Sequence, residues 1–513
     1  MAIKIILLLV FFSVMVGVGI YCRRHATDVN GFVLGGRSVG PWLTSFAYGT
    51  SYFSAVIFVG YAGQFGWKFG IASTWVGIGN AIIGSLLAWV VLGRRTRLLT
   101  QKLESATMPE FFGKRFNSNA LKIAAAIIVF VFLIPYTASL YNGLSRLFSM
   151  AFSIDYSVCI IVMAALTAVY VIAGGYMATA INDFIQGIIM LFGIVAVIAA
   201  VLSQNGGFTA SLTALANVSD ASSEATSVPG IFASFFGPHP FDLLAVVILT
   251  SLGTWGLPQM VQKFYAIKNE RAIGKGTIIS TLFALVVAGG CYFLGGFGRI
   301  FDIDVASVGY DAIIPAMLEK LPDILIALVV ILVLSASMST LSSLVLTSSS
   351  TLTIDLIKPF SKKMDDRRQL SVMRVFIAVF VLISAVLALV QYKMNISSIA
   401  QLMGISWGAL AGAFLAPFVY GLYWKRTTTA GCVASFVFGV GIMVANLFFR
   451  PYFPTFIQSP VNCGAFAMLA GLVIVPVVSL ITKKPDQDKV GEMFSCYDEQ
   501  VTGPAKEFLG EGN

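Results

Sequence analysis

Long apolar stretches separated by short polar loops recur along the whole chain. Thirteen of them are long enough to cross the hydrocarbon core of a bilayer as helices, which takes about 20 residues. These spans are predicted at residues 3–22, 41–65, 71–92, 121–143, 157–175, 180–202, 240–262, 275–297, 324–355, 372–391, 398–423, 430–449 and 462–482. The pattern therefore predicts an all-α polytopic membrane protein with about thirteen transmembrane helices.

Two of the predicted spans are interrupted at corresponding places. The second has Gly49 and polar residues near its middle, and the seventh contains Gly253, Gly256 and Pro258. The two spans lie five apart, so they cross the membrane in opposite directions. Interrupted helices at matching positions of two halves are typical of inverted-repeat transporters, whose binding sites lie near the bilayer midplane. The alternative is that the glycines only allow helices to pack closely.

The ninth predicted span ends in a run of hydroxyl side chains. Twelve of the nineteen residues in 335–353 are Ser or Thr. One helical face, at the spacing i, i+3, i+4, i+7, carries Ala336, Ser339, Thr340 and Ser343. Neutral oxygens on one face suit a small hard cation such as Na⁺. The alternative is that the hydroxyls bond to carbonyls of their own helix or permit close helix packing.

Charged residues are rare and unevenly placed. They make up 11% of the 513 residues, about half of the share in soluble domains. With the N-terminus outside, 26 of the 33 Lys and Arg residues fall in cytoplasmic loops or in a cytoplasmic C-terminal tail, and Lys263 is counted among them. The basic residues behind the net charge of +9 therefore indicate the orientation of a protein of the cell membrane. We expect no nucleic-acid partner.

Residues that carry enzymatic or metal chemistry are scarce. The six cysteines are scattered without a CxxC pair, and the two histidines, His25 and His239, fall in predicted loops. This excludes a disulfide framework, a zinc site and most histidine-based catalysis. We therefore expect neither an enzyme nor a cofactor.

Few ionisable residues lie within the predicted spans. Asp183 falls near the cytoplasmic start of span six, and a carboxylate inside a membrane is a functional candidate. The alternatives are a helix-start residue favoured by the helix dipole, or a proton site. Because span nine runs toward the cytoplasm, Ser342 and Ser343 lie one turn beyond Ser339, at the depth expected for Asp183. Asp355, at the end of span nine, is expected to be interfacial.

Six stretches resemble the sodium:solute symporter family in the family's own order. They read FVLGGRSVGPW, ATMPEFFGKRF, AGGYMATAINDFIQG, GLPQMVQKFYA, SASMSTLSS and APFVYGLYWKR. The resemblance covers nearly the whole chain and implies a leucine-transporter-like core of five plus five helices in inverted repeat. It divides the chain into a first span with its loop (1–40), repeat one (41–202), an extracellular loop (203–239), repeat two (240–424), two further spans (425–482) and a tail (483–513).

The resemblance also implies two sodium sites. The common site of the family corresponds to three backbone carbonyls and two hydroxyls, from Thr50, Phe53, Ala336, Ser339 and Thr340. A second site, present in some members, corresponds to Asp183, Ser339, Ser342 and Ser343. Na⁺ is the only metal ion that the resemblance implies, and it would act as the coupling ion.

The substrate is less sharply indicated. Candidate contacts from spans two, four and seven are Tyr52, Ser54, Gln64, Tyr136, Thr254, Trp255 and Gln259. The proline branch is similar around Tyr136 and Pro258, but it differs at Val56, Thr254 and Tyr52, where it carries further aromatics and a carboxylate. Span two looks more like the monocarboxylate and iodide branch, and the GLPQ segment resembles the pantothenate branch.

The expected protein is a Na⁺-coupled symporter that imports a small organic solute by alternating access, such as proline, a monocarboxylate or a vitamin. Its partners would be Na⁺, the solute and the lipid bilayer, and we expect it to function as a monomer. One alternative is a proton-coupled carrier with Asp183 as the proton site. Another is a membrane sensor, although the tail of about 30 residues is short for a signalling domain.

Overall fold

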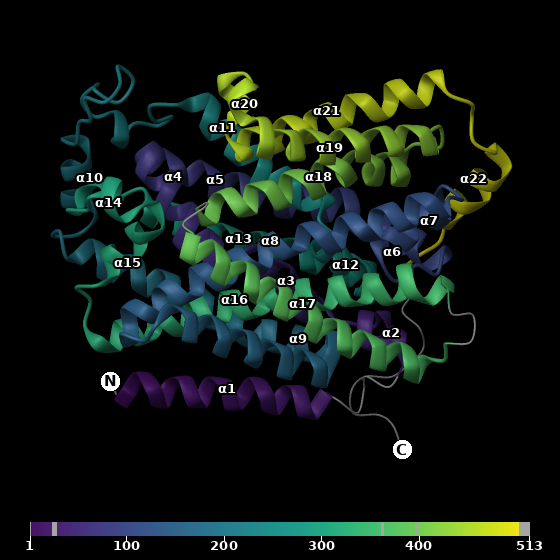
Figure 1. The fold of residues 1–513 in the computed structure, drawn as a ribbon, viewed down its shortest axis with the longest axis horizontal. Coiled ribbons are helices and arrows are strands. Elements are labelled where there is room, and N and C mark those ends of the chain that lie inside the picture. The colour runs from purple at the N-terminus through teal and green to yellow at the C-terminus, as the bar shows by residue number, and fades with distance from the viewer. Residues whose placement is uncertain (1, 23–27, 361–363, 395–397, 502–513) are drawn as a thin grey trace.

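The computed structural model describes residues 2–22, 28–360, 364–394 and 398–501, and long helices dominate it (Figure 1). Ten helices in these ranges are long and apolar enough to cross a membrane, or eleven when one bent pair counts as a span. The longest helices are α1 (Ala2–Cys22), α8 (Asn119–Phe152), α9 (Tyr156–Ser203), α13 (Glu270–Gly295), α16 (Asp323–Thr351), α17 (Asp366–Met394), α18 (Ile399–Tyr423), α19 (Thr429–Phe449) and α21 (Pro460–Ile481). The expected all-α, multi-span architecture is confirmed.

The count of thirteen spans is approximate because some neighbouring predicted spans form one continuous helix with no loop between them. The fifth and sixth both lie within α9, which bends at Gly175. Gly175 has φ 57°, and a Cβ there would lie 2.8 Å from the Phe32 carbonyl oxygen. Glycine is therefore required at this bend, both for its positive φ and for the close approach of Phe32 on the short helix Val29–Leu34.

Shorter helices complete the described chain. They are α2 (Val29–Leu34), α3 (Pro41–Tyr52), α4 (Ala62–Phe69), α5 (Thr74–Gly79), α6 (Arg94–Lys102), α7 (Met108–Arg115), α10 (Phe208–Ala216), α11 (Pro240–Ser251), α12 (Pro258–Ala266), α14 (Val305–Val308), α15 (Ile313–Leu318), α20 (Thr455–Gln458) and α22 (Gln487–Phe494). Helix α22 lies at the end of the molecule opposite the start of α1 (Figure 1).

Helix α16 occupies the centre of the bundle. It packs against α3, α8, α9 and α17, and every residue from 332 to 351 is buried. In contrast, α1 lies along one edge beside α9, and α19 and α21 lie along the opposite edge (Figure 1). The hydroxyl-rich run is therefore enclosed by other helices of the protein.

Both predicted interruptions are present. After α3 the chain is extended at Phe53, with φ −102° and ψ 132°, and it resumes as the π-helix η3 (Val56–Tyr61). The second interruption lies between α11 and α12, where the 3₁₀ turn η8 (Leu252–Gly256) precedes a 48° bend. Pro258 begins α12, a position where its missing N–H costs nothing.

Helix α12, which follows the break in the seventh predicted span, is hydrogen-bonded to α2 and to the segment after it. Val39 exchanges backbone hydrogen bonds with Ala266 and Lys268, at 3.1 and 3.0 Å. Gln262 donates a hydrogen bond from Nε2 to the Val33 carbonyl at 3.2 Å. These contacts fix the rotation of α12 about its axis, and they thereby fix which of its side chains point into the bundle.

Candidate functional site

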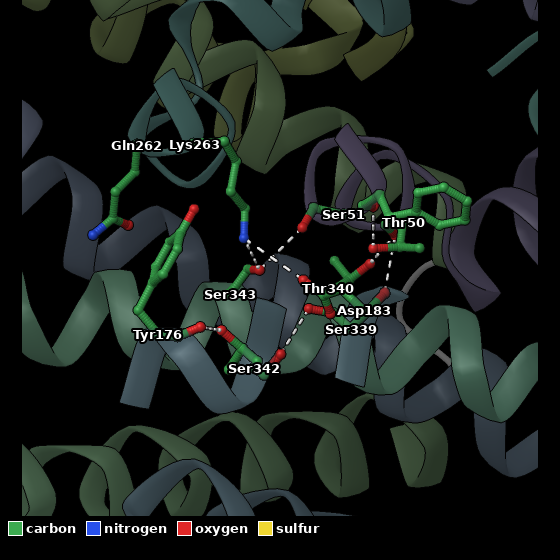
Figure 2. A network of polar contacts seen from close by, with 12 residues as sticks. Thr50, Ser51, Tyr176, Asp183, Gln262, Lys263, Ser339, Thr340, Ser342 and Ser343 are labelled. Carbon is green, nitrogen blue, oxygen red and sulfur yellow. Dashed lines mark hydrogen bonds and ion pairs between the residues drawn. The ribbon is translucent and has the colours of Figure 1, made fainter. Parts of the chain in front are cut away.

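The atoms expected to form the common sodium site lie together where the break after α3 meets α16 (Figure 2). The Ser339 hydroxyl oxygen lies 3.0 Å from the carbonyl oxygens of both Thr50 and Ala336, and it can donate its one proton to either. The Thr340 hydroxyl lies 3.2 Å from the Phe53 carbonyl oxygen and 3.1 Å from that of Ala336. Two hydroxyls and three carbonyls therefore converge on one buried point, which suits a cation that prefers oxygen ligands.

A further hydroxyl of α16 supports this junction. Ser337 Oγ accepts a hydrogen bond of 3.2 Å from the backbone N–H of Ala55, the residue that restarts the helix after the break. Buried backbone N–H groups need such partners, and inside a membrane water does not supply them. The sequence marks Ser337 only as one member of the hydroxyl run, because its partner is distant along the chain.

Two of the residues expected to form a second sodium site, Asp183 and Ser343, contact a lysine (Figure 2). Lys263 extends from α12 into the bundle, and its Nζ lies 3.8 Å from Asp183 Oδ2 and 3.0 Å from Ser343 Oγ. Its ammonium also lies 5.2 Å from the centre of the Tyr176 ring. The side chains of Lys263 and Asp183 are 3% and 0% exposed. The expectation that Lys263 belongs to a cytoplasmic loop is therefore wrong.

The other two predicted members of this second site are not directed at Asp183. Ser342 donates its hydroxyl to the carbonyl of Ser339 at 2.8 Å, within α16, and the Ser339 hydroxyl belongs to the first group of oxygens. Both carboxylate oxygens of Asp183 lack a hydrogen-bond partner among the described residues. Lys263 is therefore the cation that the fold itself brings to this carboxylate.

Asp355, expected at the membrane interface, is enclosed by the protein at the end of the ninth span. Its side chain is fully buried, and Thr107 at the start of α7 donates a hydrogen bond of 2.6 Å to Oδ2. The ammonium of Lys122, near the start of α8, lies 3.8 Å from Oδ1. The carboxylate is covered because α7 and α8 pack over the end of α16 and the π-helix that follows it, η11 (Leu352–Ile357).

Four of the seven predicted substrate contacts have a buried polar atom without a hydrogen-bond partner in the described chain. These atoms are Ser54 Oγ, Gln64 Oε1, Tyr136 Oη and Gln259 Oε1. Trp407 on α18, which sequence reasoning missed, also has a buried indole N–H without a hydrogen-bond partner in the described chain. Its ring packs edge-on against that of Tyr136, with 5.8 Å between the ring centres. Buried polar groups are normally paired, so such atoms are candidates for contact with a polar ligand.

The remaining three predicted contacts bond to nearby backbone. Thr254 donates to the Ser251 carbonyl at 2.8 Å, and Trp255 donates from its indole to the Ile83 carbonyl at 3.0 Å. Tyr52 donates to the carbonyl of Thr250. Gln64 lies ten residues beyond Ser54, about 15 Å along a helix, so it belongs to a different depth. The free polar atoms near the breaks are thus carried by Ser54, Tyr136, Gln259 and Trp407.

Sequence comparison finds related proteins. The sodium:solute symporter family matches residues 32–439. The chain is 28% identical over 499 residues to the osmoregulated proline transporter of Bacillus subtilis, covering 94% of this chain and 96% of the relative. It is also 28% identical over 518 residues to a sodium/proline symporter of Staphylococcus aureus, with 94% and 93% covered.

Solved structures share the fold. A Na⁺-coupled sialic acid symporter superposes with a TM-score of 0.73 at 16% identity, covering 94% of this chain and 99% of that one. Mhp1, a nucleobase-cation-symport-1 family transporter, superposes with a TM-score of 0.53 at 13% identity, covering 90% and 97%. The inverted-repeat symporter fold and the match over most of the sequence lead to one conclusion. The chain belongs to the sodium:solute symporter family, and it is a Na⁺-coupled membrane transporter and not an enzyme.

Proposed function

We propose that this protein imports a small organic solute that carries a carboxylate, with L-proline as the first candidate, and that it does so by alternating access. The convergence of the Thr50, Phe53 and Ala336 carbonyls with two hydroxyls of α16 carries the ionic part of this proposal. A Na⁺ ion at this point would join the broken span to α16. Ion binding would then favour one arrangement of the two repeats over the other.

The solute would bind beside the break in the seventh span. Helix α12 begins there, and the free N–H groups of a half-helix N-terminus attract an anionic group such as a carboxylate. Gln259 is the second residue of α12, and its unpaired side-chain oxygen can accept a hydrogen bond from a solute N–H or O–H. Proline, monocarboxylates and pantothenate all carry a carboxylate, and the proline relatives make proline the first solute to test.

The direction of transport follows from the charges of the loops. The end of the molecule that is rich in Lys and Arg would face the cytoplasm, with the N-terminus outside and the C-terminal segment inside. Both proposed sites lie within a single chain, so a monomer would suffice. The predicted division into two repeats at residues 41–202 and 240–424 is part of the same proposal.

Uptake by the purified chain in liposomes tests this function. We expect radiolabelled L-proline to accumulate under an inward Na⁺ gradient, and not under a proton gradient with K⁺ in place of Na⁺. Lactate and pantothenate, tested in parallel, decide between the solute classes. If none of the three accumulates with Na⁺, or if protons alone drive uptake, the proposal is wrong.

Substitution of one hydroxyl tests the ion site. Thr340→Ala should raise the Na⁺ concentration for half-maximal uptake by about tenfold or more, because a dehydrated ion loses an oxygen ligand. Ser350→Ala is the matched control, because Ser350 is equally buried on the same helix and its hydroxyl bonds only to carbonyls of that helix, at 2.7 and 3.1 Å. An unchanged Na⁺ dependence in Thr340→Ala would remove the ion from this junction.

A further inference from the structure

We propose that the ammonium group of Lys263 takes the place of a second Na⁺ beside Asp183, so that each transport cycle carries one Na⁺. The inference rests on the proposed Na⁺-coupled function and defines its stoichiometry. It replaces the expectation of a second ion bound by Asp183, Ser339, Ser342 and Ser343.

Charge balance is the first argument. A carboxylate as fully buried as that of Asp183 requires a counter-charge, and the chain supplies one at 3.8 Å. The pair is neutral as it stands. A Na⁺ ion added to it would leave an uncompensated positive charge inside the bundle, which is costly in a low-dielectric surrounding.

The positions of the possible ligands are the second argument. The Ser343 oxygen already lies 3.0 Å from the Lys263 ammonium and 3.0 Å from the Ser51 hydroxyl. The Ser342 hydroxyl is bonded to its own helix at 2.8 Å. The face of the Tyr176 ring covers another side of the ammonium, in the position of a cation–π contact. Two of the four groups expected around an ion, Asp183 and Ser343, therefore lie around Nζ, and a third, Ser342, is bonded to its own helix.

The anchoring of α12 is the third argument. A lysine near the end of a span can extend its ammonium toward water, and Lys263 does not. On the neighbouring residue, Gln262 Oε1 accepts a hydrogen bond from Thr347 at 2.9 Å, and its Nε2 donates to Val33. Because α12 is thus fixed to both α2 and α16, its inward-facing side chain is held at the carboxylate.

The consequence is a smaller maximum accumulation of the solute. One Na⁺ moving down a tenfold gradient and 100 mV can drive about 500-fold accumulation of a neutral solute, whereas two ions could drive roughly 10⁵-fold. Unlike a bound ion, the ammonium is not released at the end of the cycle. It can only move with α12 relative to Asp183.

Equilibrium binding of ²²Na⁺ to the purified full-length chain counts the ions directly and does not require the solute to be known. We expect one Na⁺ per wild-type protein, and the same single ion bound about tenfold or more weakly in Thr340→Ala. In Lys263→Met the carboxylate of Asp183 is left without its cation, and we expect a second Na⁺ to bind. The combined variant Lys263→Met/Asp183→Asn should return to one.

Conservative variants separate this outcome from misfolding. Lys263→Arg keeps the positive charge and should bind one Na⁺, and Lys263→Gln serves as a second neutral variant if Lys263→Met aggregates. Two Na⁺ ions in the wild type would overturn the inference and leave the proposed function intact. A single ion in folded Lys263→Met and Lys263→Gln would also overturn it. If neither the wild type nor these variants bind Na⁺, the proposed function fails together with the inference.

Discussion

Among the described residues, two fully buried carboxylates lie at the same distance from a lysine but have different surroundings. Asp183 and Lys263 lie in the middle of the bundle, and Asp355 and Lys122 lie at the end of α16, each pair at 3.8 Å. Asp355 accepts a hydroxyl hydrogen bond from Thr107, and Lys122 is 15% exposed. Asp183 has no hydrogen bond among the described residues, and Lys263 is almost completely buried.

The difference shows that the distance between charges does not define the role of a pair. The Asp355 pair has local compensation, since a hydroxyl stabilises the carboxylate and the lysine is partly exposed. The Asp183 carboxylate depends on the charge of Lys263, because it has no hydrogen bond among the described residues. The Lys263 ammonium also contacts Ser343 and the Tyr176 ring, but without Asp183 it would be a buried cation with no counter-charge. We therefore expect the Asp355–Lys122 pair to stabilise the end of α16, and the Asp183–Lys263 pair to affect ion coupling.

The largest effect should come from Asp183→Asn. This change leaves the Lys263 ammonium buried without a carboxylate, and we expect it to destabilise the protein by about 3–5 kcal/mol. Thermal unfolding in detergent measures the loss. The added change Lys263→Gln, which removes the orphaned charge, should restore most of the stability. If Asp183→Asn is as stable as the wild type, the two charges do not depend on each other.

A smaller effect is expected for Asp355→Asn. The asparagine oxygen can still accept the Thr107 hydroxyl, and Lys122 can turn toward water, so we expect a loss of about 1–2 kcal/mol. The Na⁺ concentration for half-maximal proline uptake should stay within about twofold of the wild-type value, because this pair lies outside the proposed ion site. A large change in Na⁺ dependence would instead assign Asp355 to coupling.

The smallest effect is expected for Lys122→Met. Because Lys122 is partly exposed and Asp355 retains its hydroxyl partner, the cost should be below about 1 kcal/mol. The same unfolding assay provides the measurement, with Lys263→Met as the comparison. Equal losses in the two lysine variants would mean that the two pairs are equivalent, contrary to the contrast drawn from their surroundings.

Sequence patterns were sufficient wherever the signal was local or repeated. The apolar spans, the breaks near Gly49 and at Gly253–Pro258, and the hydroxyl-rich face of 335–353 all follow from spacing along one helix. The five ligands of the proposed common site came from the family resemblance, and the fold brings all five together. Trp407 was missed because an isolated tryptophan in an apolar span is indistinguishable from ordinary packing.

Lys263 and Asp355 show where such patterns fail. Each is a charged residue near the end of a predicted span, where hydropathy assigns charges to the membrane surface. Whether such a side chain turns outward or inward depends on the rotation of its helix and on what packs against it. For Lys263 the decisive contacts come from α2 and α16, and for Asp355 from α7 and α8, all of them distant in the sequence.

The sequence by itself determined that this chain is a multi-span helical symporter with two broken helices and a hydroxyl-rich central span. These features depend on periodicity, composition and motifs that each segment carries alone. Only the tertiary structure decided which charges meet inside the bundle. The energy of a buried ion depends on partners brought together by packing, and Asp183 and Lys263 become a pair only because α9, α12 and α16 converge on one point.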